Sequence, residues 1–431
     1  MSTPAINWIW RWVIFAGVVL GAGTLVVSAA RHALAAHWAA SSNPQMRLRA
    51  AASEPENADL WYQLGRYRQL DFEHSDLPLA ISYYQRATSL NPGSPSYWMD
   101  LAGAYETAGD ASKAEQAFRE AHRLYPISAE AAWQLGNFLL RQGRVPEAFQ
   151  QIHDAVTVDP RLTALAVSLC WRSTQNIDQI LKTVLPDAQD DNWGAVQFFV
   201  EVREPMPAMA VWKRIAAHHA SLAIMQAFPL LDMLIETGQA EDAQSVWTQA
   251  LSAAGIPVTT EPGGSLIWNG GFEQELLNGG FDWRSGPIEG AKIGWDEQIV
   301  RSGRRSLRVD FDGTANIDFQ NVSQYVRVQP ATRYRFTAFF RAEELSTENG
   351  IRFEIRDVSH PGNPARFTPN VAGTQPWAEK EAEFVTGADT ELLRVVLRRS
   401  RSEKLGNKIR GTAWVDDVAL VPLPALARTP Q

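Results

Sequence analysis

The chain has 431 residues, enough for two or three domains, and a formal net charge of −8 at pH 7. General nucleic-acid binding requires a basic surface, so this acidic balance predicts no nucleic-acid partner. The single cysteine, Cys170, excludes an internal disulfide and argues against a cysteine-based zinc site. Because Cys170 lies in an apolar stretch, we expect it to be buried.

The first segment of interest, residues 12–30, carries no charged side chain. As a helix it would extend about 28 Å, close to the thickness of a bilayer's hydrocarbon core. Trp8, Trp10 and Trp12 at its start are typical of membrane-interface anchors. We predict an uncleaved signal anchor over residues 1–36, and a cleaved signal peptide ending near residues 27–29 is the alternative. The favoured location is a bacterial inner membrane, crossed once, with the body in the periplasm.

After this segment a pattern recurs with a period of 34 residues. The recurring positions are Ala80, Ala114 and Ala148, then Tyr84, Phe118 and Ile152, then Pro92, Pro126 and Pro160. Small residues allow two helices to approach closely, the bulky residue fills the space between them, and proline ends the second helix. The pattern therefore predicts stacked helical hairpins.

Each unit also contains an amphipathic first helix. In the second unit Trp98, Leu101, Ala102 and Tyr105 follow the i, i+3, i+4, i+7 spacing of one helix face. Equivalent first-helix positions in the other units include Trp61, Gly65 and Gly136. These residues resemble the tetratricopeptide repeat, a family of two-helix scaffolding repeats. The resemblance implies an all-α solenoid whose groove binds a protein partner; a helical bundle that repeats by coincidence is the alternative.

Diverged units flank the clear ones. Residues 45–53 fit the second half of an extra hairpin, and the spacing of the clear units returns between Leu230 and Ala250. Trp193, Ala208 and Trp212 indicate one more hairpin, whereas helices in residues 161–185 are predicted from composition alone. We predict one solenoid over residues 45–254.

The hydrophobic period changes from 3.6 to 2 after a Pro-, Thr- and Gly-containing linker at residues 255–264. Apolar residues alternate with polar ones in four stretches, at residues 307–311, 334–340, 353–355 and 393–397. Short alternating strands separated by turn residues predict an all-β antiparallel sandwich over residues 265–423, followed by a tail at 424–431.

Two phrases bracket this region: Asn269-Gly270-Gly271-Phe272-Glu273 opens it, and Trp414-Val415-Asp416-Asp417-Val418 closes it. The arrangement resembles the jelly-roll carbohydrate-binding modules of families 4 and 9, in the galactose-binding-like group. That resemblance implies a sandwich fold, sugar binding and a structural calcium, with Glu273, Asp416 and Asp417 as its carboxylate ligands. The alternative is a tight turn beside a solvated strand end.

Sugar binding would require exposed aromatic rings with polar neighbours. Tyr325 and Phe339 are the best candidates because they fall on the polar side of alternating strands, and Arg335 and Arg352, on the same polar side, are the arginines predicted to bind glycan with them. The same polar positions carry further arginines, namely Arg308, Arg341, Arg356, Arg394 and Arg398. If they share one face, they would attract an acidic polysaccharide or an acidic partner; the alternative is a solvated face balanced by carboxylates.

No catalytic pattern is evident: the sequence has neither a glycine-rich phosphate loop nor a G-x-S-x-G elbow. We therefore expect no enzyme, no catalytic residue and no cofactor beyond a structural calcium. The favoured hypothesis is a membrane-tethered adaptor in surface-polysaccharide assembly or export. Its alternatives are a glycan-processing enzyme with its site in the sandwich, and a purely structural assembly subunit.

Overall fold

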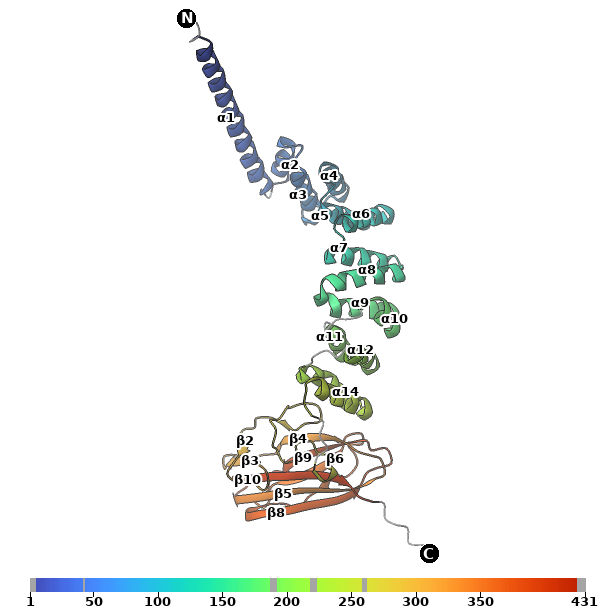
Figure 1. Cartoon of the computed structure of the whole chain (residues 1–431), viewed down its shortest axis with the longest axis vertical. Helices are drawn as coiled ribbons and strands as arrows, with labels where there is room; N and C mark the ends of the chain where they lie inside the picture. The colour runs from blue at the N-terminus through green and yellow to red at the C-terminus, as the bar shows by residue number, and fades with distance from the viewer. Residues whose placement is uncertain (1–4, 42, 187–191, 218–222, 258–261, 425–431) are drawn as a thin grey trace. The chain divides into compact units, whose positions relative to one another are not determined.

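The computed structural model describes residues 5–41, 43–186, 192–217, 223–257 and 262–424. The chain divides into two compact units, residues 1–187 and 188–431 (Figure 1). The boundary falls within the predicted solenoid, so the last helices belong to the same unit as the sandwich. Parts of the predicted linker (255–264) and tail (424–431) lie outside the described residues.

The first unit is entirely helical. Its helices are α1 (Ala5–Ala39), α2 (Pro44–Ser53), α3 (Ala58–Leu70), α4 (Leu77–Leu90), α5 (Pro95–Thr107), α6 (Ala111–Leu124), α7 (Ala129–Arg141), α8 (Val145–Val158), the 3₁₀ turn η1 (Pro160–Leu162), α9 (Thr163–Thr174) and α10 (Ile177–Thr183). The pairs α3–α4, α5–α6 and α7–α8 make extensive contacts and correspond to the three clear repeats. The predicted helical hairpins are confirmed.

The close approach within each pair depends on small residues. Ala80, Ala114 and Ala148 are completely buried. At Gly136 a Cβ would lie 2.8 Å from Cγ1 of Ile152, and at Gly65 it would lie 2.8 Å from the ring of Tyr84. Only glycine therefore allows the two helices of these pairs to pack at this distance without displacing the opposing side chain.

The long helix α1 combines two environments. Its apolar stretch is exposed, with Leu20 73% and Leu25 72% exposed. Near its C-terminal end Ala35 is buried in a cluster with Ala50 and Ala51 of α2 and with Leu60 of α3. The end of α1 and α2 thus form a helix pair that packs on the first repeat, so the predicted extra hairpin is completed by α1 itself.

Among the described residues, the second unit begins with four helices and two 3₁₀ turns. These are α11 (Trp193–Glu201), α12 (Pro205–Ala217), η3 (Ile224–Ala227), α13 (Phe228–Glu236), α14 (Ala240–Ala253) and η4 (Pro262–Gly264). Trp193 and Trp212, predicted to mark a diverged hairpin, pack with their ring centroids 5.8 Å apart between α11 and α12. Ala208 and Trp212 are fully buried, as are Ala80 and Tyr84 of the first clear repeat.

Two five-stranded antiparallel sheets form the rest of the second unit. The strands are β1 (Arg284–Ser285), β2 (Ala291–Asp296), β3 (Ser306–Asp312), β4 (Phe319–Arg327), β5 (Arg333–Leu345), β6 (Arg352–Asp357), β7 (Arg366–Phe367), β8 (Gly373–Val385), β9 (Leu392–Arg399) and β10 (Arg410–Pro422). One sheet has the order β1-β4-β9-β6-β7 and the other β2-β3-β10-β5-β8. We call them the β4–β9 sheet and the β5–β10 sheet.

The sandwich core lies between the two sheets. Phe336 and Phe340 of β5 and Phe353 of β6 are fully buried, and Phe353 packs against both at centroid distances of 5.1 and 5.6 Å. The intervening residues of β5, such as Arg335 and Phe339, lie on the outer side of the strand. As predicted from the alternation of apolar and polar residues, one face of β5 lies in the core and the other faces outward.

The opening segment of the sandwich runs beside its last strand. The Leu266 amide donates to the carbonyl of Leu420 at 2.8 Å, and the Val418 amide donates to the carbonyl of Gly270 at 2.9 Å. A Cβ at Gly270 would lie 2.0 Å from the Val418 carbonyl oxygen. The glycine in the opening phrase is thus required by the backbone approach itself.

Candidate functional site

The first helices of the repeats present a continuous polar and aromatic row. The Tyr62 hydroxyl in α3 donates to Asp100 in α5 at 2.8 Å, and Arg66 lies 3.5 Å from the same carboxylate. Burial, reinforced by Asp100, raises the pKa of Tyr62 to about 12. Further along the array, Arg141 in α7 pairs with Glu106 in α5 at 2.7 Å.

These contacts connect the first helix of one repeat to the first helix of the next. At Gly103, one turn beyond Asp100, no atom lies within 4 Å of a Cβ position. The row therefore contains an open position flanked by fixed side chains. We call the face carrying Tyr62, Arg66, Asp100, Gly103 and Arg141 the first-helix face.

The indole groups of two repeat residues fix the turns between repeats. Trp61 donates from Nε1 to the Pro55 carbonyl at 3.0 Å, and Trp98 donates in the same way to Pro92 at 2.9 Å. Both prolines lie six residues before the tryptophan, so the same local interaction recurs. The signature tryptophans therefore serve the packing between repeats.

The predicted glycan residues occupy two different sheets. Tyr325 on β4 and Arg352 on β6 belong to the β4–β9 sheet, while Arg335 and Phe339 on β5 belong to the β5–β10 sheet. All four lie on outer faces, and the outer faces of a sandwich point in opposite directions. The structure therefore does not bring them into one binding surface.

The hypothesis of a single arginine-rich face is wrong for the same reason. Arg308, Arg335 and Arg341 lie on β3 and β5, whereas Arg352, Arg356, Arg394 and Arg398 lie on β6 and β9. Sequence alternation places a residue inside or outside a sheet but does not say which of two sheets contains its strand. The arginines form two groups with different neighbours.

On the β5–β10 sheet, the arginines and Phe339 already interact with other side chains of the protein. Arg335 pairs with Glu383 at 2.8 Å, which raises the pKa of its guanidinium. Arg308 pairs with Asp310 at 2.9 Å, and Arg341 stacks over the ring of Trp414 at 5.6 Å. The Arg301 guanidinium lies 4.5 Å from the centre of the Phe339 ring.

The β4–β9 sheet has a less balanced charge. The Tyr325 ring lies 5.3 Å from the guanidinium carbon of Arg284 and 5.8 Å from that of Arg394. Arg284 pairs with Asp232 of α13 at 2.6 Å. Within the described part of the chain, Arg394 has no carboxylate within ion-pair distance, although its Nη2 donates to Ser323 at 3.2 Å.

The predicted calcium ligands Glu273, Asp416 and Asp417 lie close together, and their carboxylates accept hydrogen bonds from other groups of the protein. A Cβ at Gly271 would lie 3.8 Å from Cγ of Glu273, 3.9 Å from an oxygen of Asp416 and 4.0 Å from an oxygen of Asp417. Backbone amides occupy the carboxylates: Arg301 donates to Asp416 at 2.9 Å and Arg304 donates to Glu273 at 2.8 Å.

Asp417 accepts a hydrogen bond of 2.6 Å from the Ser302 hydroxyl. Burial raises the pKa of Asp416 to about 6 despite its amide donors, and the nearby charge of Asp417 acts in the same direction. Within the described ranges, no group of three or more His, Cys, Asp or Glu side chains is positioned to hold a metal. These carboxylates thus fix the loop at residues 301–305, and calcium binding by them stays a prediction.

The last helices dock on the sandwich through aromatic side chains. Trp247 of α14 packs edge to face with Trp268 at 5.8 Å and with Phe281 at 6.4 Å. At Gly279 a Cβ would lie 2.3 Å from the ring of Phe228 in α13, so the segment before β1 touches the helices closely. With the Asp232–Arg284 pair, these contacts join α13 and α14 to the β4–β9 sheet.

Comparisons with known proteins agree with this description of the helices. A family model described as tetratricopeptide repeat matches residues 69–126 and 114–160. The small glutamine-rich tetratricopeptide repeat-containing protein 2 of Mycosarcoma maydis is 32% identical over 100 residues, which are 23% of this chain and 28% of that protein. The helical half contains tetratricopeptide repeats.

Solved structures similar to part of this chain were also found. A structure of MamA is 16% identical, with a TM-score of 0.29, and covers 40% of this chain and 89% of that chain. A structure titled "CBM4 structure and function" is 18% identical, with a TM-score of 0.28, and covers 36% of this chain and 99% of that chain.

Several residues form contacts in the structure that the sequence patterns did not predict. Tyr62, Arg66 and Asp100 form the polar row, yet the period-34 pattern selects buried positions and ignores outward ones. Asp232 of α13 and Arg284 of β1 form an ion pair, and nothing in the local pattern of either segment indicates a partner some 50 residues away. Opposite charges at Asp232 and Arg284 were the only available signal.

Proposed function

We propose that the chain is a membrane-anchored, non-enzymatic scaffold that binds a protein partner through its tetratricopeptide repeats and glycan through its β-sandwich. The observation that carries the proposal is the repeat array itself, with the open first-helix face around Gly103. Arrays of this kind expose extended surfaces for recognition. Participation in surface-polysaccharide assembly or export is the more specific form of the proposal.

Membrane anchoring is supported by α1. Among the described residues, one helix is long and apolar enough to cross a membrane: residues 10–39, with a mean hydropathy of 2.2 over an 18-residue stretch. Helix α1 is continuous, and its C-terminal end packs against α2 and α3. A membrane-embedded α1 would therefore hold the first repeat next to the bilayer surface. We place the amino terminus in the cytoplasm and the body in the periplasm of a bacterial cell.

The partner surface can be tested with a photo-crosslinking amino acid in the full-length membrane protein. We expect Gly103, on the first-helix face, to crosslink to a discrete protein, and the exposed Gln116 of α6 to give none. Equal crosslinking at both positions, or none at either, would contradict the scaffold proposal. Glycan turnover by the purified chain alone would favour the enzyme alternative instead.

The orientation can be tested by cysteine labelling. Cys170 is fully buried and burial raises the pKa of its thiol to about 12, so it should not react in the folded protein. A Leu405→Cys variant introduces a thiol at a fully exposed position of the sandwich. Labelling of intact cells by a reagent that crosses only the outer membrane is expected; labelling only after lysis would contradict a periplasmic body.

A further inference from the structure

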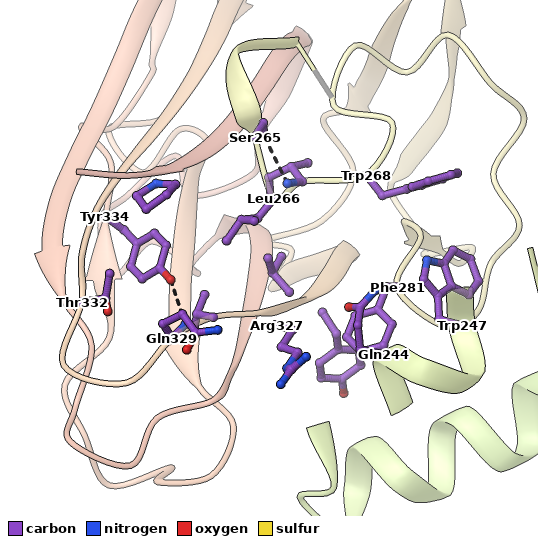
Figure 2. A pocket seen from close by; sticks show the side chains of 15 residues that line it. Gln244, Trp247, Ser265, Leu266, Trp268, Phe281, Arg327, Gln329, Thr332 and Tyr334 are labelled. Atoms are coloured by element: carbon purple, nitrogen blue, oxygen red, sulfur yellow. Dashed lines mark hydrogen bonds between the residues drawn. The ribbon is translucent and has the colours of Figure 1, made fainter. Parts of the chain in front are cut away.

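A cavity of about 520 Å³ lies where α14 meets the sandwich (Figure 2). Gln244 and Trp247 line it from the helix, Trp268 and Phe281 from the segment before β1, and Tyr325 from β4. A volume of this size is typical of sites for small molecules or for single units of a polymer. The cavity uses residues from both parts of the second unit, so neither part alone contains it.

The cavity lining contains a buried indole N–H that has no hydrogen-bond partner among the described residues. Trp268 is only 8% exposed, and its indole N–H has no acceptor among the described residues. Buried polar groups without partners are uncommon in native proteins and call for an explanation such as a bound ligand. Arg327 also lines the cavity, and no described carboxylate lies within ion-pair distance of it.

Two more unpartnered donors flank Tyr325. The buried Nε atoms of Arg284 and Arg394 form no hydrogen bond in the described structure, and both guanidinium groups lie within 6 Å of the Tyr325 ring. Asp232 balances the charge of Arg284 but not that of Arg394. The wall at Tyr325 therefore carries uncompensated positive charge.

Among the described residues that line the cavity, none is an aspartate or glutamate. Its other polar residues are neutral: Gln244, Ser265, Gln329 and Thr332. The rest is apolar or aromatic, including Leu266, Val326 and Phe281 (Figure 2). The complementary ligand carries a negative charge, several acceptor oxygens and some apolar surface, all within a compact unit.

We propose that this cavity binds a carboxylate-bearing sugar unit of an acidic glycan. A uronate offers a carboxylate for the bidentate geometry of Arg327, hydroxyls for the glutamine amides, and ring C–H groups for the apolar wall. Arg394 adds positive potential from beside Tyr325. The inference rests on the proposed glycan binding of the sandwich and specifies its substrate class and position.

The experiment is calorimetric titration of the full-length chain in detergent. The probes are trimers of galacturonate, glucuronate and mannuronate, each with its methyl-esterified neutral counterpart, and hexaglutamate as an acidic peptide. We expect at least one free uronate trimer to bind, with its ester at least about tenfold weaker, and the binding to weaken as salt increases.

The decisive variants are Arg327→Gln and Arg394→Gln. We expect Arg327→Gln to weaken uronate binding by at least about tenfold, since Arg327 lines the cavity, and Arg394→Gln to weaken it by several-fold, since Arg394 lies behind the Tyr325 wall. Arg335→Gln is the matched control, because it removes the same charge from the opposite sheet, and it should leave the affinity within about twofold. Unchanged circular dichroism and thermal unfolding would confirm that the variants are folded.

The outcomes separate the two proposals. Neutral esters that bind as well as free uronates, or uronate binding that is unchanged in Arg327→Gln, would overturn the acidic-sugar site while leaving glycan binding intact. Failure of every saccharide to bind would overturn both the site and the proposed glycan function. Equal binding of hexaglutamate would also overturn the inference, because it would show a non-selective anion surface.

Discussion

The repeat array and the sandwich are stabilised in different ways. In α3–α8 the buried contacts join helices that are adjacent in sequence, and the side chains that pack are small or apolar. In the sandwich the central strands pair over long separations, as when Val309 of β3 faces Ala413 of β10. Polar groups such as Arg399 and Asp416 are also fully buried there. The comparison shows why one region can be read from a short period and the other cannot.

The largest effect we predict tests the buried polar network of the sandwich. Arg399 is 1% exposed and donates to the carbonyls of Asn349, Ile317 and Asn407 and to the side chain of Asn316. Burial lowers the pKa of its guanidinium. Arg399→Met should reduce the free energy of unfolding of the second unit by about 3–5 kcal/mol, because these acceptors would be left without a donor.

Urea unfolding of the full chain in detergent, followed by near-ultraviolet circular dichroism, would measure this loss. Arg401→Met removes the same charge at an exposed position two residues away and should change the free energy by less than about 0.5 kcal/mol. Similar values for the two variants would show that apolar packing alone stabilises the sandwich, as it does in the repeats.

The second prediction concerns the boundary between the two kinds of structure. Trp247 is 2% exposed and packs against Trp268 and Phe281 of the sandwich segment. Trp247→Ala should destabilise the second unit by about 3–4 kcal/mol and separate the unfolding of α11–α14 from that of the sandwich. Parallel far- and near-ultraviolet circular dichroism would detect two transitions for the second unit, where we expect one in wild type.

Trp133 provides the control for this variant, because it is a half-buried tryptophan of α7 in the first unit. Trp133→Ala should leave the transition of the second unit in place. If Trp247→Ala also leaves a single transition at the wild-type position, the last helices do not depend on the sandwich.

The third prediction uses the raised pKa of Asp416, about 6 in the folded chain against an ordinary value of 3.8. The folded state holds the proton more tightly than the unfolded state. The associated stability is therefore complete below about pH 4 and is lost as pH rises through about 6. The difference in unfolding free energy between wild type and Asp416→Asn should change by about 2–3 kcal/mol over this interval.

Titrating unfolding against pH with a calcium chelator present would measure that difference. A pH-independent difference would contradict the assigned cause, namely burial without a compensating charge. Adding calcium at neutral pH is the complementary measurement. Stabilisation of wild type but not of Asp416→Asn would show that a bound calcium ion compensates the negative charge of the Asp416 carboxylate.

Much of the fold follows from the sequence for physical reasons visible in particular residues. Ala114 and Phe118 recur at fixed offsets because each hairpin solves the same packing problem. Residues 307–311 alternate because β3 has one face in the core. In contrast, Tyr325 and Phe339 look equivalent in sequence yet lie on different sheets, since strand order depends on the long connections between strands.

The candidate sites were harder to predict. The cavity at Arg327 and Trp268 requires α14 to dock on β4, and that docking depends on Trp247, whose spacing marks it only as a repeat core residue. The carboxylates Glu273, Asp416 and Asp417, the predicted calcium ligands, lie close together. Their hydrogen-bond donors, the amides of residues 301–305, belong to a loop whose sequence has no periodic pattern. The hydrogen bonds from these amides to the carboxylates could therefore not be predicted.

The smallest predicted effect distinguishes two glycines inside the repeat array. A Cβ at Gly136 would lie 2.8 Å from Ile152 and 3.3 Å from the Ala148 carbonyl, whereas one at Gly103 would meet nothing within 4 Å. Alanine favours a helix over glycine by about 1 kcal/mol, so Gly103→Ala should stabilise the first unit by about 0.5–1 kcal/mol. Gly136→Ala should instead destabilise it by about 1 kcal/mol, since overpacking exceeds the gain in helix propensity.

Urea unfolding monitored at 222 nm, where the helices dominate the signal, would give both values. Opposite signs would show that the array depends on close contact at the signature glycine and not on helix propensity in general. If both alanine variants were stabilising, Ile152 would have room to move aside, and the packing of the repeats would be less restrictive than the period of 34 residues implies.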